Sequence, residues 1–192
     1  MNRISVILTS ILLLPNLVFS QEFSCGTHFN EENLAHLKEV IKTIELPQGK
    51  DNGLNCVPIR YHVVRSDEGN SVVTQESILW SLTTMNRQFR EAGLSFYLIE
   101  PPIFHDESAY LALSNTVTED DIRALFDSPD NAVHFYVLDD LNGPGGFAYY
   151  PSPTAYSNAI FILSNSVAGS VGGTIDHELG HYFSLPHTFE GT

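Results

Sequence analysis

The chain has 192 residues, 43% of them hydrophobic, and a formal net charge of −14 at pH 7. So acidic a surface repels phosphate backbones and anionic lipid, which argues against nucleic-acid and membrane-surface partners. The length suffices for one domain with its own core, because domains cluster near about 100–150 residues.

The first twenty residues have the layout of a secretory signal peptide. Arg3 gives a basic start, an apolar run extends from Ile4 to Leu14, and Pro15 and the small Ser20 follow. The run is shorter than the roughly 20 apolar residues that span a bilayer, so a transmembrane anchor fits less well. We therefore expect residues 1–20 to be removed on export, leaving a secreted protein, extracellular or periplasmic, with no membrane contact.

Residues 21–55 differ in pattern from the rest of the chain. Apolar residues at helical spacing predict a helix over 33–46, which Pro47 closes. The polar stretch 48–55 predicts a linker. We interpret residues 21–55 as a prosegment or linker, and residues 56–192 as the domain itself.

From Val57 onward, strand and helix patterns alternate. Strands are predicted over 57–65, 94–99, 133–138, 147–150 and 159–163, and helices over 74–92, after Thr118 and into the final histidines. Thr74 and Gly93 delimit the first of these helices, Thr118 with Asp121 forms a capping box, and 143–146 (GPGG) forces a loop. This order predicts an α+β fold in which helices pack on a twisted mixed sheet.

Residues 177–187 have the sequence HELGHYFSLPH. On a helix at about 100° per residue, His177 and His181 lie about 40° apart and point at one place. Two neutral imidazole nitrogens at this spacing are typical zinc ligands. Glu178 is turned around the helix from them, so it can take the proton of a water that zinc activates for attack on a peptide carbonyl.

His187 can join these ligands only if the helix breaks, since six residues place it about 240° around the axis from His181. Pro186 supplies a breaker, because it lacks an amide hydrogen and clashes with the carbonyl of Tyr182. Three histidines leave a fourth position open, as in catalytic zinc sites. The remaining histidines, at 28, 36, 62, 105 and 134, lack this geometry and are predicted to be surface or packed residues.

The segment 177–187 resembles the extended zinc signature of the metzincin clan, and its continuation HTFEG is similar to the pappalysin or cytophagalysin family. Weaker similarity covers GGFAYYP at 145–151, the strands at 57–64 and 133–138, and residues 25–27 (CGT). The resemblance implies an endopeptidase that acts on proteins or peptides with one catalytic Zn²⁺. It also implies that an upper subdomain carries the active-site helix at the floor of a horizontal cleft. A further implication is a rim strand that pairs with extended substrate, for which the candidates are Gly146, Phe147, Ala148, Tyr149 and Tyr150.

The chain departs from that family in two respects. Ser184 stands where the clan has glycine, and a left-handed turn there costs about 1–2 kcal/mol. The family also has a lower subdomain with a methionine turn, whereas the only methionines here are Met1 and Met85. We therefore expect residues 1–192 to be the N-terminal part of such an enzyme, with the lower subdomain missing. The resemblance allows a structural Ca²⁺, but nothing in the sequence supports one, and nothing indicates the oligomeric state.

Two questions stay open from the sequence alone. The first is whether the chain is an active zinc endopeptidase or a truncated, inactive secreted domain that only binds zinc. The second concerns Cys25. Zymogens of the resembled family imply a latent form in which its thiolate fills the fourth zinc position. Export equally permits a disulfide between Cys25 and Cys56, and a free thiol without a function is the third alternative.

Overall fold

The computed structural model describes residues 25–27, 35, 39, 53–126, 131–150, 159–169 and 173–189. The predicted signal peptide at 1–20 lies outside these ranges, as do most of the predicted helix at 33–46 and of the linker at 48–55. Within the predicted helix, Ala35 and Glu39 are helical and exposed. In the described ranges, no helix is both long and apolar enough to cross a membrane.

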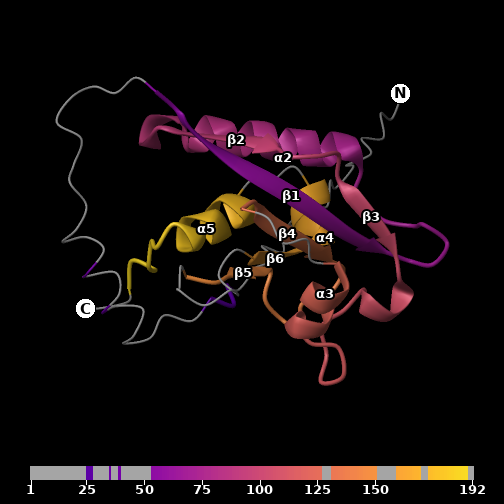
Figure 1. The fold of residues 1–192 in the computed structure, drawn as a ribbon. Helices are drawn as coiled ribbons and strands as arrows, with labels where there is room; N and C mark the ends of the chain where they lie inside the picture. Colours follow the sequence, from indigo (N-terminus) through magenta and orange to yellow (C-terminus); the bar gives the residue numbers. More distant parts are fainter. Residues whose placement is uncertain are drawn as a thin grey trace, which may run out of the picture.

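Six strands of the described chain form one mostly parallel sheet (Figure 1). They are β1 (Asn55–Arg65), β2 (Leu94–Leu98), β3 (Ile103–Asp106), β4 (Val133–Leu138), β5 (Gly146–Ala148) and β6 (Ala159–Leu163). Their order is β2-β1-β4-β6-β5, with β3 also paired to β1. Every pairing is parallel except that of β5 with β6, which is antiparallel, and β5 lies at the edge. The predicted mixed sheet with packed helices is confirmed.

Helices cover both faces of this sheet, so its central strands are buried on both sides (Figure 1). The helices are α2 (Gln75–Gln88), α3 (Glu119–Phe126), α4 (Ser164–Ala168) and α5 (Gly173–Tyr182), with short 3₁₀ turns η1 (Arg90–Ala92) and η2 (Ser108–Tyr110). Side chains of α2, α4 and α5 pack against one face, where Tyr61 and Val63 of β1 point. Those of α3 pack against the other face, with Val64 of the same strand. All six residues of β4 are buried, as expected for a strand between two layers.

The ends of the helices follow local sequence signals. The Thr74 hydroxyl accepts the Ser77 N–H at 3.1 Å at the start of α2, and the predicted box between Thr118 and Asp121 forms at the start of α3. Helix α2 ends at Gln88 rather than at the predicted Ala92. Its continuation tightens into η1, and Gly93, at φ 75°, stops it.

The predicted strand at 147–150 is partly wrong. Strand β5 covers Gly146–Ala148, so Gly146 belongs to the strand rather than to the loop, and Tyr149 and Tyr150 lie beyond it. The Tyr149 N–H still donates to the carbonyl of Ala159, the first described residue of β6, but this bond is long, at 3.4 Å.

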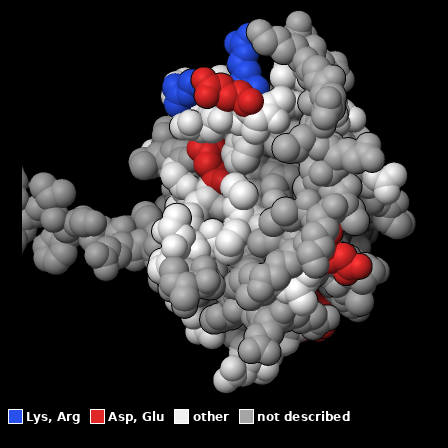
Figure 2. Space-filling model, turned by 90° about the vertical axis from the view of Figure 1, so that its left-hand side faces the viewer, with Lys and Arg blue, Asp and Glu red and all other residues white. Residues whose placement is uncertain are grey.

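Figure 2 shows the face that lies at the left of Figure 1. Among the described residues there, acidic and basic side chains gather side by side near the top of the view, and further acidic groups lie at its right. The rest of the described surface on this face is uncharged, so it presents no extended basic patch. This agrees with the net charge of −14.

Candidate metal centre

Helix α5 brings the first two candidate ligands together. His177 and His181 lie one turn apart, and their Nε2 atoms are 3.0 Å from each other, with ring planes at 87°. Ile175 and Leu179 anchor the helix in the core on the sheet. As a result His181 is 3% exposed, whereas His177 lies at the surface.

The chain reverses direction immediately after α5, at Ser184, which has φ 69°. The Ser184 N–H donates to the His181 carbonyl at 2.8 Å, and the Leu185 N–H to the Gly180 carbonyl at 3.0 Å. These two bonds form a Schellman cap, in which glycine is the usual left-handed residue. The helix therefore ends before Pro186, which was predicted to break it, and Ser184 takes the left-handed conformation that disfavours a non-glycine residue.

The reversal carries His187 back to the same place. Its Nε2 lies 3.1 Å from that of His181, with ring planes at 72°. The reversal also orients His181 itself, because the Nδ1–H can donate to the Leu185 carbonyl at 2.7 Å. A proton on Nδ1 leaves the lone pair on Nε2 facing His177 and His187. The Tyr150 hydroxyl lies 3.2 Å from the same Nδ1.

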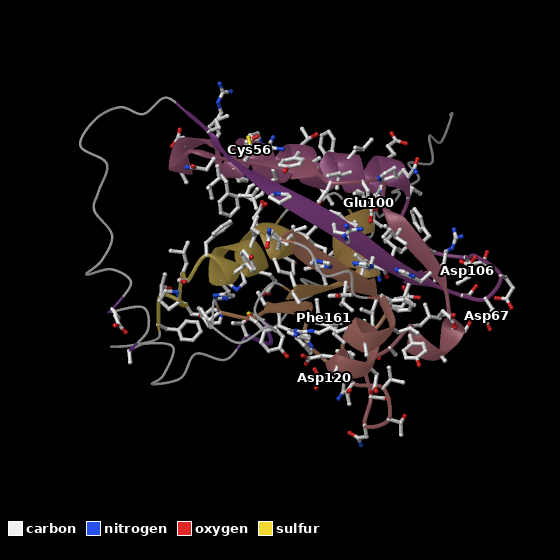
Figure 3. The ribbon with its side chains drawn as sticks, in the orientation of Figure 1. Cys56, Asp67, Glu100, Asp106, Asp120 and Phe161 are labelled. Carbon is white, nitrogen blue, oxygen red and sulfur yellow. The ribbon has the colours of Figure 1, made fainter. Side chains whose placement is uncertain are left out.

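Cys25 provides a fourth donor at this place. Its Sγ lies 3.4 Å from the Nε2 of His181, and the donor atoms of Cys25 and the three histidines all lie within 4.8 Å of one another. Burial raises the pKa of this thiol. Both cysteines are free, and Cys56 lies exposed at the start of β1 (Figure 3), so the structure contains no bridge between them.

The carboxylate of Glu178 lies beside these donors and is 1% exposed. Its Oε2 accepts the Thr27 hydroxyl at 3.0 Å and lies 3.6 Å from Cys25 Sγ. Its Oε1 is buried and has no hydrogen-bond partner in the part of the chain that the structure describes. Burial raises the pKa of Glu178 to about 7, although the bonds from Thr27 and Cys25 oppose that rise.

Strand β5 borders the centre. A side chain at Gly146 would place Cβ 2.8 Å from Ile162 Cδ1 and 2.9 Å from Glu178 Cγ, so glycine is what lets α5 approach the strand. The Gly26 N–H donates to the Gly146 carbonyl at 2.9 Å, which sets the segment 25–27 along β5. Of the predicted rim residues, Gly146 therefore touches the centre directly, and Tyr150 reaches it through His181.

Known proteins resemble the chain over most of its length. It is 29% identical over 196 residues to an extracellular metalloprotease of Colletotrichum graminicola, a match that covers 88% of the chain and 66% of that protein. It is 27% identical over 202 residues to one of Arthroderma gypseum, covering 97% and 67%, and 28% identical over 150 residues to extracellular metalloprotease 1 of Coccidioides posadasii, covering 68% and 51%. No protein-family model matches the chain.

The chain is a homologue of fungal extracellular metalloproteases. It spans between about half and two thirds of the length of these three relatives, with shares of 51% to 67%. The homologues are, by their names, hydrolases that depend on a metal ion. The group formed by Cys25, His177, His181 and His187 is accordingly the candidate metal centre of this chain.

Sequence reasoning did not single out two parts of this centre. The Leu185 carbonyl orients His181, but main-chain acceptors leave no trace in residue identity. Thr27 entered only as part of a resembling tripeptide, and no spacing relates it to Glu178, which lies 151 residues away. Only the folded chain brings these groups together.

Proposed function

We propose that the protein is a secreted zinc-dependent endopeptidase in which His177, His181 and His187 hold Zn²⁺ and Glu178 is the general base. The convergence of three Nε2 atoms beside a buried carboxylate supports this most directly. We further propose that residues 1–20 are a signal peptide, 21–55 a prosegment or linker, and 56–192 the catalytic domain. The substrates would be proteins or peptides, as the names of the homologues indicate.

The donor set fits zinc in number and kind. Zinc binds imidazole nitrogen at about 2.0–2.1 Å in a tetrahedral arrangement, which puts neighbouring nitrogens about 3.3 Å apart. The Nε2 separations of 3.0 and 3.1 Å are close to that value. The unpartnered Oε1 of Glu178 also fits, because a buried acceptor beside the metal ligands has a use only if a polar molecule enters the centre.

When bound, zinc would supply Lewis acidity, polarising the scissile carbonyl and making a water more acidic. The residues of the chain do the rest. His181 is held in the required tautomer by the Leu185 carbonyl. Glu178 accepts a proton from the attacking water, keeps it on its carboxylate and passes it to the leaving amide nitrogen. The outer edge of β5 offers the backbone N–H and C=O groups of Gly146 and Ala148 to an extended substrate, whereas those of Phe147 face β6. Main-chain bonds of this kind give sequence-tolerant affinity.

Replacing Glu178 with glutamine tests this assignment. In an active, processed full-length protein, Glu178→Gln should lower the hydrolysis of a fluorogenic peptide by about 10²–10⁴-fold while keeping bound zinc, because the amide cannot accept the proton. Glu119→Gln is the matched control, since Glu119 is a half-buried glutamate on α3, bonded to Tyr149 outside the centre. A Glu178→Gln enzyme that keeps more than a few per cent of wild-type turnover would exclude Glu178 as the base. Zinc binding without hydrolysis in the wild type would favour an inactive zinc-binding domain.

We also propose that Cys25 keeps the enzyme latent until residues 21–55 are removed. The position of its Sγ, 3.4 Å from the Nε2 of His181 and within 4.8 Å of the other donor atoms, supports this proposal, because a thiolate bound to the metal there would fill the fourth position and exclude water. Titration of the denatured, metal-chelated, unreduced precursor should find two free thiols, whereas none would indicate a Cys25–Cys56 bridge. Cys25→Ala in the full-length precursor should raise activity before any processing, and unchanged latency would contradict the role of Cys25.

A further inference from the structure

Thr27 contacts the strand, the carboxylate and the thiol of the candidate centre at once. It is 6% exposed, although it lies in the short segment 25–27. Its hydroxyl oxygen accepts the Ala148 N–H at 2.9 Å and lies 3.0 Å from Glu178 Oε2 and 3.3 Å from the Ala148 carbonyl. Its own N–H points at Cys25 Sγ, 3.4 Å away.

The hydroxyl has one hydrogen and two acceptors within reach. The Glu178 oxygen is the closer of the two, and an ionised carboxylate makes the stronger bond. The Thr27 side chain therefore hydrogen-bonds both to the Ala148 N–H on β5 and to one carboxylate oxygen of Glu178. These are the groups that an extended substrate and an attacking water would use under the proposed function.

Gly26 fixes how the threonine is presented. A Cβ at Gly26 would lie 2.9 Å from Pro144 Cγ, closer than Cβ atoms approach in proteins, and 3.2 Å from Phe147 Cβ, which is a tight contact. With the Gly26 N–H bonded to the Gly146 carbonyl at 2.9 Å, the backbone lies directly on the loop and strand. The backbone next to Thr27 is therefore held by close packing on Pro144 and Phe147 and by the bond to Gly146, and this places the Thr27 side chain at Ala148 and Glu178.

We infer that Thr27 is a second inhibitory contact, separate from Cys25, and that it positions Cys25 by holding the segment 25–27 on β5 and Glu178. All the bonds involved join protein groups, so the contact exists without a metal ion. Its effect on catalysis rests on the proposed function, whereas its effect on the position of Cys25 does not. The two consequences call for two measurements.

The first measurement uses the metal-free full-length precursor. With the exposed Cys56 changed to serine, the rate at which Cys25 reacts with a disulfide reagent such as DTNB reports how firmly the segment is held. Thr27→Val keeps the shape but loses both hydroxyl bonds, and should raise that rate by about tenfold. Thr27→Ser keeps the hydroxyl and should react within about twofold of the parent. Equal rates for the valine variant and the parent would overturn the inference.

Gly26→Ala provides a second route to the same result. The added methyl group must push the segment off Pro144 and Phe147 while leaving the Thr27 hydroxyl in the chain, so the rate should again rise. Thermal unfolding of each variant shows whether the domain itself has changed. A rate that stays at the parent value in a folded Gly26→Ala protein counts equally against the inference.

The second measurement is peptide hydrolysis by the zinc-loaded, unprocessed precursor. Thr27→Val should be more active than the wild type, Thr27→Ser should not, and Cys25→Ala with Thr27→Val should exceed either single change. If Cys25 reacts faster in Thr27→Val but no variant, processed or not, hydrolyses the peptide, the proposed function is rejected. The inference that Thr27 holds the segment 25–27 in place would still stand. If the processed enzyme hydrolyses the peptide normally but the thiol rates of the variants are unchanged, the inhibitory role of Thr27 is rejected. The proposed function would still stand.

Discussion

The described part of the chain contains two groups of three histidines whose nitrogens approach to nearly the same distance. At the end of α5, His181 Nε2 lies 3.0 and 3.1 Å from the Nε2 atoms of the other two members, His177 and His187. On the sheet, the two ring nitrogens of His62 each lie 3.1 Å from a nitrogen of a neighbour, His105 on β3 or His134 on β4. Distance alone does not distinguish the two groups.

Their orientation does distinguish them. On the sheet, the His62 ring lies within 14° and 9° of the planes of its neighbours, and it uses Nδ1 toward one and Nε2 toward the other. This is a row of N–H···N bonds in which no three lone pairs meet. At the end of α5 the rings cross at 87° and 72°, and the same atom of each ring faces one point. A metal ion needs the second arrangement, so the comparison predicts different responses to the same kind of mutation.

The largest difference should be in metal content. In the processed protein, from which Cys25 has been removed, the double change His177→Ala, His181→Ala should lower bound zinc from about one ion per chain to near none, because one imidazole cannot hold the ion alone. The matched change His62→Gln, His134→Gln should leave the stoichiometry unchanged in the protein that folds. Metal analysis after gentle dialysis measures both. If the His177→Ala, His181→Ala variant retains zinc, or the folded His62→Gln, His134→Gln variant loses it, the two groups of histidines do not differ in metal binding.

Stability without metal should respond in the opposite way. His62 is fully buried, and His62→Ala leaves a cavity and removes bonds from two buried or half-buried neighbours, which should cost about 2–5 kcal/mol of unfolding free energy. His177 is exposed, and His177→Ala should change the free energy of unfolding by no more than about 0.5 kcal/mol. Urea unfolding of the chelated proteins gives both values. Similar costs for the two changes would show that the row on the sheet is not a structural element.

Lowering the pH should destabilise the row of histidines on the sheet, because His105 is harder to protonate in the folded protein than in the unfolded chain. Burial lowers the pKa of His105, although Asp106 opposes this, and Phe126 and His62 pack against its ring. The unfolded imidazole takes up a proton near pH 6.5, so the unfolded state binds more protons below that value and the unfolding free energy falls between about pH 7 and pH 5.

His105→Gln should reduce this acid-dependent loss, because the titrating group is gone. Asp106→Asn should increase it, because the carboxylate that favours the charged imidazole is gone. Urea unfolding at several pH values, compared as slopes, separates these effects from any constant change in stability. Equal slopes in wild type and His105→Gln would contradict the assignment.

Much of this architecture follows from local sequence. The strand at Val133–Leu138 and the caps at Thr74 and Thr118 were predicted because each depends on neighbouring residues alone. The missed elements, β3 and α4, have four and five residues, too few for a period to show. The row of histidines was predicted only as packed or surface residues, because its pairing depends on the parallel register of β1 with two strands that lie far along the chain.

The candidate metal centre also has some contacts that local sequence predicts and others that only the folded chain brings about. One helical turn relates His177 to His181, so the sequence predicts their approach. Cys25 lies 156 residues from His181, and only a resemblance, not a spacing, indicated its place. The approach of His187 was predicted from Pro186, but the bonds that reverse the chain form two residues earlier, around Ser184. A left-handed serine is visible only in the backbone.

The smallest predicted effect concerns that serine. The row on the sheet needs only regular strands, whereas the convergent group needs a reversal through Ser184 at φ 69°. Ser184→Gly should relieve about 1–2 kcal/mol of backbone strain, and the greater freedom of glycine in the unfolded chain should offset roughly half of this. The expected gain is about 0.5–1 kcal/mol, or a few degrees in Tm, with zinc affinity nearly unchanged.

Asn142→Gly is the matched control. Asn142 also has a left-handed backbone, at φ 58°, but asparagine tolerates this conformation, so the gain there should be smaller or absent. Calorimetry of the metal-free proteins compares the two changes directly. If Ser184→Gly lowers Tm, the serine hydroxyl or its neighbours contribute more than the backbone costs. The convergent group would then be held without strain, as the row on the sheet is.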